Sequence, residues 1–170
     1  MNAIISPCGT YRYRLDREIG GDGYRVAGIM VNPSTADADT DDATIRKWIG
    51  FAQRNGWSSV TIGNKFAFRA TDIKRLREPG DRVGPENDQF IEQIMREADL
   101  VIVAWGTLGK IPDVLRSRWK DIVRIADRVG CKMHCFGTAA DGHPLHPLML
   151  GYDTRVIEWQ VPWFANRRAA

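Results

Sequence analysis

The stretch GIMVNPSTADADTDDATIRKW, residues 28–48, leads from an apolar run into the start of an amphipathic segment. The apolar run ends at Asn32-Pro33, because proline fixes its own φ and biases the preceding residue towards an extended conformation. Small polar residues follow, among them four aspartates at positions 37, 39, 41 and 42. These residues can serve as turn and helix-cap residues, or they can form one wall of an active site.

Apolar runs and amphipathic segments alternate around this stretch. Strands, the first two joined as a hairpin by a glycine-rich turn, are predicted at residues 10–15, 24–31, 59–64, 100–105 and 132–137. Helical spacing predicts helices at residues 42–55, 85–98 and 113–129. We therefore expect an α/β fold, a three-layer α/β/α sandwich around a mainly parallel four-stranded sheet, with an antiparallel N-terminal strand. Counting from the strand at 24–31, the predicted order is 2-1-3-4.

Length and composition fit one soluble globular domain. Of the 170 residues, 44% are hydrophobic and 26% are charged, which is ordinary for such a domain. We assign residues 1–170 to a single domain, with a core at about 8–159 and a C-terminal tail at 160–170. No apolar run approaches the roughly 18 residues of a membrane span, and the first residues lack a signal-peptide pattern. The expected location is the cytoplasm, without a membrane partner.

Positive charge is concentrated between Asn64 and Arg82. This segment has six basic and three acidic residues, a net charge of +3 that equals that of the entire chain. Such a segment is compatible with a polyanionic partner such as nucleic acid. The other interpretation is a solvated loop and helix face.

Two sets of residues have the chemistry of metal ligands. Cys131 and Cys135 flank His134, but in a strand the two cysteines share one face and the histidine lies on the other, so we interpret them as structural. An iron–sulfur cluster would need a fourth thiolate beyond these two and Cys8. The aspartate run does not match the spacing of a calcium-binding EF-hand loop. We therefore predict neither a metal nor a cofactor, and keep a metal site on the run Asp37–Asp42 as an alternative.

Unusual polar residues follow every predicted parallel strand. The segments after the strands are NPSTADADTDD, KFAFRAT, WGTLGK and GTAADGHPLHPLML, the second of them preceded by Asn64. Because ligands of open α/β sheets bind beyond the carboxyl ends of the strands, these residues are expected to gather in one site.

The side chains in these segments can contact a nucleobase. The amide of Asn64 both donates and accepts, which suits a base edge, although it can also stabilise its own turn. Phe66 and Phe68 can stack on a base or belong to the core. A histidine at 143 or 146 can donate to developing negative charge or act as an acid or base, and either can also be only a loop residue.

Three motifs, VNPSTADADTDDATIRK, AWG and DGHPLHPL, resemble the signature of a small bacterial and phage family catalogued as a domain of unknown function, from about Cys8 to Tyr152. Their order is also remotely similar to that of the uracil-DNA glycosylase superfamily, with counterparts at Asn32-Pro33, Asn64, Trp105-Gly106 and His146-Pro147. The likeness has gaps. Met30 stands where that superfamily has glycine, the last motif reads His-Pro-Leu, and the aspartate-rich insert has no counterpart.

The superfamily resemblance implies a uracil-DNA-glycosylase-like fold and hydrolysis of an N-glycosidic bond of a modified or damaged base, in nucleic acid or a related nucleoside. It implies that Asn32 positions the water, with Asp37 sharing the role of base, and that His146 stabilises the departing base anion. The base would contact Asn64, Phe66, Trp105, Gly106 and His143. Phosphates, with DNA as the expected partner, would contact Lys65, Arg69, Lys74 and Arg75.

Two other functions use the same residues. A non-catalytic module could bind a nucleotide or modified base in the same pocket. A metal-assisted hydrolase could use the aspartate run. The substrate base and the oligomeric state are not predicted.

Overall fold

The computed structural model describes residues 1–77 and 80–162. Most of the predicted C-terminal tail therefore lies outside the described residues. In chain order the strands and helices are β1 (Asn2–Ile5), β2 (Arg12–Glu18), β3 (Arg25–Met30), α1 (Ala43–Asn55), β4 (Ser59–Asn64), α2 (Asn87–Glu97), β5 (Leu100–Val103), α3 (Trp119–Val129), β6 (Met133–Cys135) and β7 (Ile157–Glu158). Short 3-10 helices are η1 (Ile73–Arg77), η2 (Leu108–Lys110), η3 (Asp113–Arg118) and η4 (Pro147–Met149).

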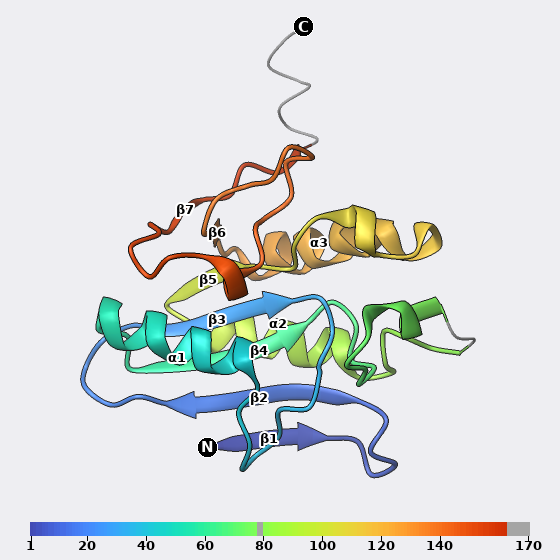
Figure 1. Cartoon of the computed structure of the whole chain (residues 1–170), viewed down its shortest axis with the longest axis horizontal. Helices are drawn as coiled ribbons and strands as arrows, with labels where there is room; N and C mark the ends of the chain where they lie inside the picture. Colours follow the sequence, from blue (N-terminus) through green and yellow to red (C-terminus); the bar gives the residue numbers. More distant parts are fainter. Residues whose placement is uncertain (78–79, 163–170) are drawn as a thin grey trace, which may run out of the picture.

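The described strands form one mixed sheet of seven, in the order β1-β2-β4-β3-β5-β6-β7 (Figure 1). Strands β4, β3, β5 and β6 are parallel to their neighbours in this group. Strands β1 and β2 are antiparallel at one edge, and β7 is antiparallel at the other. The α/β class and the mainly parallel centre are thus present, but the sheet is larger than the four strands and one edge strand that we predicted.

The predicted hairpin is wrong. Strand β2 pairs with β4, which lies between β2 and β3. The difference follows from burial: five of the six residues of β3 are buried, whereas β2 alternates charged and apolar residues. A continuous apolar run suits the interior of a parallel sheet with strands on both sides, and the charged strand takes a position nearer the edge.

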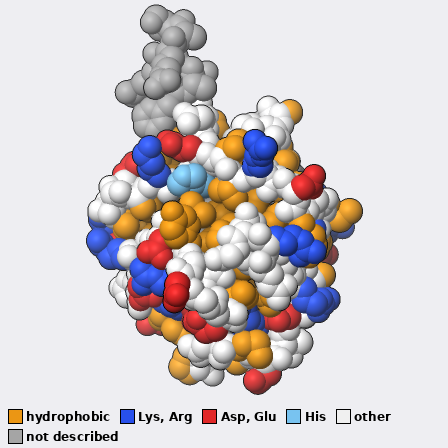
Figure 2. All heavy atoms as spheres, turned by 90° about the vertical axis from the view of Figure 1, so that its left-hand side faces the viewer, with side chains coloured by type: hydrophobic (Ala, Val, Ile, Leu, Met, Phe, Trp, Pro, Cys, Tyr) orange, Lys and Arg blue, Asp and Glu red, His pale blue; other side chains and the backbone are white. Residues whose placement is uncertain are grey.

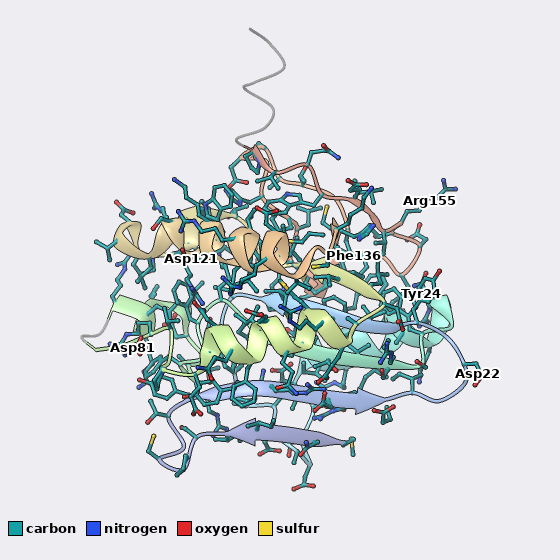
Figure 3. The ribbon with its side chains drawn as sticks, turned by 180° about the vertical axis from the view of Figure 1, so that it is seen from behind. Asp22, Tyr24, Asp81, Asp121, Phe136 and Arg155 are labelled. Atoms are coloured by element: carbon teal, nitrogen blue, oxygen red, sulfur yellow. The ribbon has the colours of Figure 1, made fainter. Side chains whose placement is uncertain are left out.

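Helices pack on both faces of the sheet. Helix α1 buries Ile45, Trp48 and Phe51 against one face, together with sheet residues such as Val26 and Ile62. Helices α2 and α3 cover the opposite face, where their apolar side chains pack with Ala27, Ile29, Val101 and Val103. Helix α1 stands in front of the sheet in Figure 1, and α2 and α3 stand in front of it in Figure 3, seen from behind.

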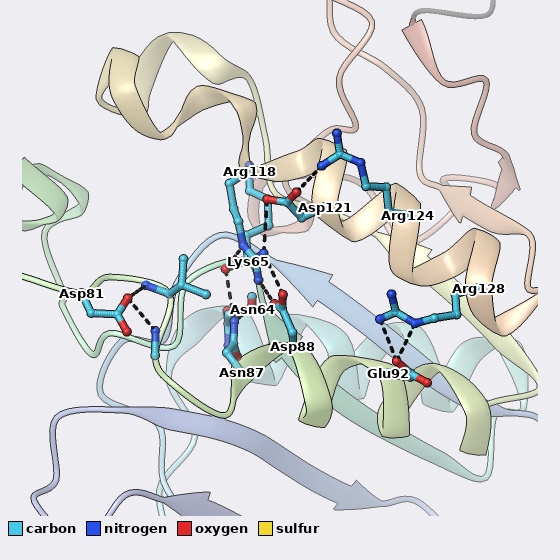
Figure 4. A network of polar contacts seen from close by, with 12 residues as sticks. Asn64, Lys65, Asp81, Asn87, Asp88, Glu92, Arg118, Asp121, Arg124 and Arg128 are labelled. Carbon is cyan, nitrogen blue, oxygen red and sulfur yellow. Dashed lines mark hydrogen bonds and ion pairs between the residues drawn. The ribbon is translucent and has the colours of Figure 1, made fainter.

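Polar contacts hold α2 against α3 and the end of β4 (Figure 4). Arg118 donates from Nε to the carbonyl of Lys65 over 2.9 Å and also pairs with Asp88 of α2. Glu92 of α2 accepts from Arg128 of α3 over 2.7 Å. Asn87 donates from Nδ2 to the carbonyl of Asn64 over 2.9 Å. The carboxyl end of β4 is therefore fixed from the α2 and α3 side of the sheet.

The surface carries charges of both signs. On the face shown in Figure 2, hydrophobic side chains gather in the middle and lysine, arginine and acidic side chains are interspersed around them. The described residues form no continuous basic track on that face. Among the described residues, no helix has both the length and the apolar character needed to cross a membrane.

Gly28 provides a test of the packing between α1 and the sheet. A Cβ at this position would lie 2.6 Å from Cδ1 of Ile62 and 2.8 Å from Cζ2 of Trp48, both buried. We expect Gly28→Ala to lower the free energy of unfolding by about 1–3 kcal/mol, as overpacked core variants do, measured by urea denaturation. Gly109→Ala is the control, because a Cβ there meets nothing within 4 Å. Equal stability of the two variants would contradict this account.

Candidate binding pocket at the strand ends

A pocket of about 570 Å³ lies beyond the carboxyl ends of β3, β4 and β5, against the start of α1 and η4. Residues from every segment that we predicted to meet there line it, namely Asn32, Asn64, Trp105, Gly106 and His146. Its apolar lining includes Met30, Ile45, Ile62, Leu145 and Leu148. Apolar walls with a few converging polar groups are typical of small-molecule sites.

Asn32 presents an acceptor to the pocket. Its Nδ2 donates to the carbonyl of Ala70 over 2.7 Å and to that of Pro33 over 3.0 Å. Pro33 also accepts from the backbone N–H of Ala70 over 2.9 Å. Since both donor hydrogens of the amide are used by the backbone, Oδ1 is the atom left for a ligand or a water molecule.

Asn64 lines the pocket and carries a buried donor. The residue is 1% exposed, and its Nδ2 has no hydrogen-bond partner within the described part of the chain. A buried donor without a partner is unfavourable, typically by about 1–3 kcal/mol, and such groups are rare in folded proteins. The Nδ2 of Asn64 therefore marks a place where a ligand acceptor or a bound water molecule is expected.

His146 presents a second donor. Its Nδ1 accepts from the backbone N–H of Leu148 over a long 3.4 Å, which leaves the proton of the neutral ring on Nε2. Burial lowers the pKa of His146 below its ordinary 6.5, and Lys110 lowers it further, against the opposing effect of Asp42. Gly106, with a φ of 78°, lies against His146, whose Cβ would be 3.6 Å from an added Cβ.

His143 lies outside the lining of the pocket. It is 4% exposed and accepts at Nδ1 from Nε1 of Trp105 over 3.5 Å. Its ring packs edge-on against Trp119, with the centroids 5.0 Å apart, and Trp105 packs similarly on Trp159 at 5.2 Å. Of the two histidines, only His146 is placed where it could contact a ligand of the pocket.

Lys65 does not lie where we predicted. Its side chain is 0% exposed, and burial, followed by the charge of Arg118, lowers its pKa to about 7. Nζ has no hydrogen-bond partner among the described residues and lies 4.9 Å from the centroid of the Trp105 ring. Lys65 directly follows β4, and the Trp105 ring that it contacts belongs to the core cluster between the sheet and helices α2 and α3. It therefore does not lie on a surface available to a phosphate.

The other predicted contact residues are also away from the pocket. Phe66 is fully buried in a core cluster with Phe68 and Leu76, so it is a core residue and not a stacking surface. Arg69 is partly buried and donates to the carbonyl of Gly9 over 3.4 Å. The exposed residues Lys74 and Arg75 lie on η1, outside the pocket lining.

The aspartate run folds as a capped loop. Asp42 accepts at Oδ1 from the backbone N–H groups of Thr44 and Ile45, each over 2.9 Å, and so caps α1. Asp37 accepts from the backbone of Asp39 and Thr40, and its carboxylate does not line the pocket. It is therefore not placed to share the role of base with Asn32.

Two buried arginines of β2 hold this loop. Arg17 donates from Nε to Oδ1 of Asp41 and from Nη2 to the carbonyl of Asp37, both over 2.6 Å. Arg12 donates from Nη1 to the carbonyl of Ala36 over 2.5 Å. Backbone caps and arginine contacts thus explain most of the polar groups in the opening stretch. Among residues 1–77 and 80–162, no cluster of three or more histidine, cysteine or acidic residues could hold a metal ion.

Arg12 and Lys110 line the pocket and were not predicted. Lys110 could have been predicted, because it belongs to WGTLGK, one of the polar segments that follow the predicted strands. Arg12 could not have been predicted from the sequence, because its position depends on an irregularity in β2. The register against β1 shifts by one residue, so that Tyr13 is left without a partner. Tyr13 stacks on Phe90 of α2, and Arg12 is turned towards the α1 face, as expected at a β-bulge.

The comparison with known families follows this geometry. Residues 12–148 match the family described as Protein of unknown function (DUF1643). The chain belongs to this family. The matched range includes every residue that lines the pocket except Met149. Searches of curated proteins and of solved structures each found no match. The predicted resemblance to a domain of unknown function is confirmed, and the similarity to uracil-DNA glycosylases stays a prediction.

The cap at Asp42 can be separated from a metal role. We expect Asp42→Ala to lower the free energy of unfolding by about 1 kcal/mol, because two backbone N–H groups lose their acceptor. Asp39→Ala should leave stability unchanged, since no bond to its carboxylate is found among the described residues. Thermal denaturation with and without Mg²⁺ would measure both. Stabilisation by Mg²⁺ that both variants abolish would contradict the capping role.

Stability should depend on pH through His143, which is buried, and His146, which is partly buried. Burial is the main cause that lowers the pKa of both His143 and His146 below 6.5. The unfolded chain therefore binds protons first as the pH falls, so this contribution is complete above pH 6.5 and is lost as the pH falls through the folded pKa values. Urea denaturation between pH 7 and pH 5 should show declining stability. A double variant, His143→Phe with His146→Gln, should show a weaker decline, and an unchanged one would contradict the assignment.

Proposed function

We propose that the pocket binds a nucleobase and that the protein hydrolyses the N-glycosidic bond of a modified or damaged base, in nucleic acid or in a related nucleoside. The observation that carries the proposal is the convergence of Asn32, Asn64 and His146 on one pocket. The three residues come from distant parts of the chain, and in the described part of the chain Asn32 Oδ1, Asn64 Nδ2 and His146 Nε2 have no hydrogen-bond partner.

The polarity of these atoms fits the reaction. Asn32 Oδ1 is an acceptor that can hold a water molecule against the sugar. Asn64 Nδ2 is a donor that can contact a carbonyl or ring nitrogen of the base. His146 Nε2 can donate to the base as it departs with negative charge, and a preformed donor of this kind is typically an important source of rate enhancement. Asn64 is buried, and a hydrogen bond made at a buried site is stronger than one made in water.

The fold supports the proposal at a coarser level. Helices cover both faces of the sheet, and the motifs lie at the carboxyl ends of its parallel strands, as in the three-layer sandwich of the uracil-DNA glycosylase superfamily. We propose that the chain shares this architecture.

We also propose that the protein is located in the cytoplasm. Its three cysteines are free, which is typical of proteins in a reducing compartment.

One observation favours a second candidate, a binding module without catalysis. Within residues 1–77 and 80–162, Asp42 is the only carboxylate that lines the pocket, and one of its oxygens is already used to cap α1. Asp37 lies elsewhere. A water molecule held by Asn32 would therefore have little help in losing its proton. Such a module would bind its nucleobase in the same pocket and release it unchanged.

Histidine variants test the catalytic proposal. We expect His146→Ala to lower turnover by about 10²–10³-fold, the usual effect of removing one electrostatic catalytic donor. The assay would measure abasic sites in duplex and single-stranded DNA that carries uracil, hypoxanthine, hydroxymethylated or bulkier modified bases. His134→Gln, on β6 and outside the pocket lining, is the matched control and should retain full turnover.

Two results would contradict catalysis. One is equal turnover of His146→Ala and the parent protein. The other is saturable binding of a nucleoside without formation of an abasic site in any of these substrates, which would favour the binding module.

A further inference from the structure

Two arginines on one strand differ in how many of their N–H donors have hydrogen-bond partners. Arg12 and Arg17 of β2 are each 2% exposed. Arg17 uses Nε, Nη1 and Nη2 in hydrogen bonds and is paired with the carboxylate of Asp41. Arg12 makes one hydrogen bond, to the carbonyl of Ala36, and its Nε is buried without a partner in the described chain. All three guanidinium nitrogens of Arg17 therefore donate, whereas only one of Arg12 does.

The charge of Arg12 is not neutralised by an adjacent acid. No carboxylate lies within ion-pair distance of it among residues 1–77 and 80–162. At longer range, Asp42 and Asp37 act against Arg69 and Arg17. Burial lowers the pKa of Arg12 to about 10, so the guanidinium remains charged at neutral pH. A buried charge without a partner is strongly unfavourable, which makes the pocket a place where an anion would be stabilised.

Other groups of the pocket extend this positive character. Lys110 is exposed at the rim. The backbone N–H groups of Thr44 and Ile45 at the start of α1 are already used by Asp42, so the helix end itself offers little to an anion. The anion would therefore be held by side chains, with Arg12 inside and Lys110 at the entrance.

We propose that the ligand is a free nucleoside monophosphate, held with its phosphate against Arg12 and Lys110 and its base against Asn64. The inference rests on the proposed function, since it takes the ligand of Asn64 to be a nucleobase. Two observations favour a free nucleotide over a base within a polymer. First, Lys65, one of the predicted contacts to the phosphates of a polymer, is buried. Second, the cationic side chains near the base site, Arg12 and Lys110, line the pocket itself. A volume of about 570 Å³ suits a small ligand.

Calorimetric titration tests the phosphate contact. The probes are the common ribonucleoside and deoxynucleoside 5′-monophosphates, the matching nucleosides, and inorganic phosphate. We expect at least one monophosphate to bind about 10- to 100-fold more tightly than its nucleoside, the gain typical of hydrogen bonds to a charged group. Arg12→Gln should remove this gain, so that the monophosphate and its nucleoside bind with similar affinity, and Arg12→Lys should retain part of it.

Two further variants test the phosphate contact if the Arg12 variants unfold. Lys110→Ala, at an exposed position, should weaken monophosphate binding several-fold without affecting the nucleoside. Lys120→Ala, an exposed lysine of α3 outside the pocket lining, is the control and should bind both as the parent protein does. Equal affinity for monophosphates and nucleosides, or no binding of any monophosphate at millimolar concentration, would overturn the inference. So would an Arg12→Gln variant that weakens both ligands equally.

The outcome separates this inference from the proposed reaction. Formation of abasic sites in DNA by a protein that shows no preference for monophosphates would refute the phosphate contact and leave the reaction standing. Monophosphate binding that depends on Arg12, without hydrolysis of any nucleotide or DNA substrate, would support the phosphate contact and refute the reaction.

Discussion

The ion pair between Arg17 and Asp41 is the contact on which the pocket depends, because it ties the loop between β3 and α1 to the sheet. Removing one partner of a buried pair typically costs about 3–5 kcal/mol, several times the value of an exposed pair, since the remaining charge is left uncompensated. Arg17 is buried on β2 and also bonds the carbonyl of Asp37. The loop is therefore held against the sheet, and its residues Asn32, Ser34 and Asp42 line one side of the pocket.

The other end of the same loop is fixed by amide contacts. The side chain of Asn32 and the backbone of Pro33 both bond Ala70, which follows β4 in the chain. These contacts link the segments after two neighbouring strands, so the walls of the pocket are set before any ligand arrives. A site assembled in this way loses little conformational freedom on binding, and its polar atoms can be aimed at a ligand instead of at each other.

The sequence alone predicted the residues whose positions follow from regular structure. Asn64 and His146 were found because the carboxyl ends of parallel strands meet at one edge, and Asp42 was among the predicted helix caps. The hairpin was mispredicted because adjacency in sequence says nothing about a third strand inserted between two others. The burial of Lys65 was missed because a lysine in a basic segment is ordinarily a surface residue. Arg12 was beyond reach, since no pattern in the sequence marks a bulge.

That bulge means that the electrostatic character of the pocket is governed from the other side of the sheet. Tyr13 is kept on the α2 face by its stack on Phe90, with the ring centroids 5.0 Å apart. If the strand regained strict alternation there, Tyr13 would turn to the α1 face and Arg12 away from it. An aromatic pair that does not line the pocket thus helps to fix whether Arg12 or Tyr13 faces it. Sequence changes under α2 can retune binding at a distance, without altering any residue of the pocket wall.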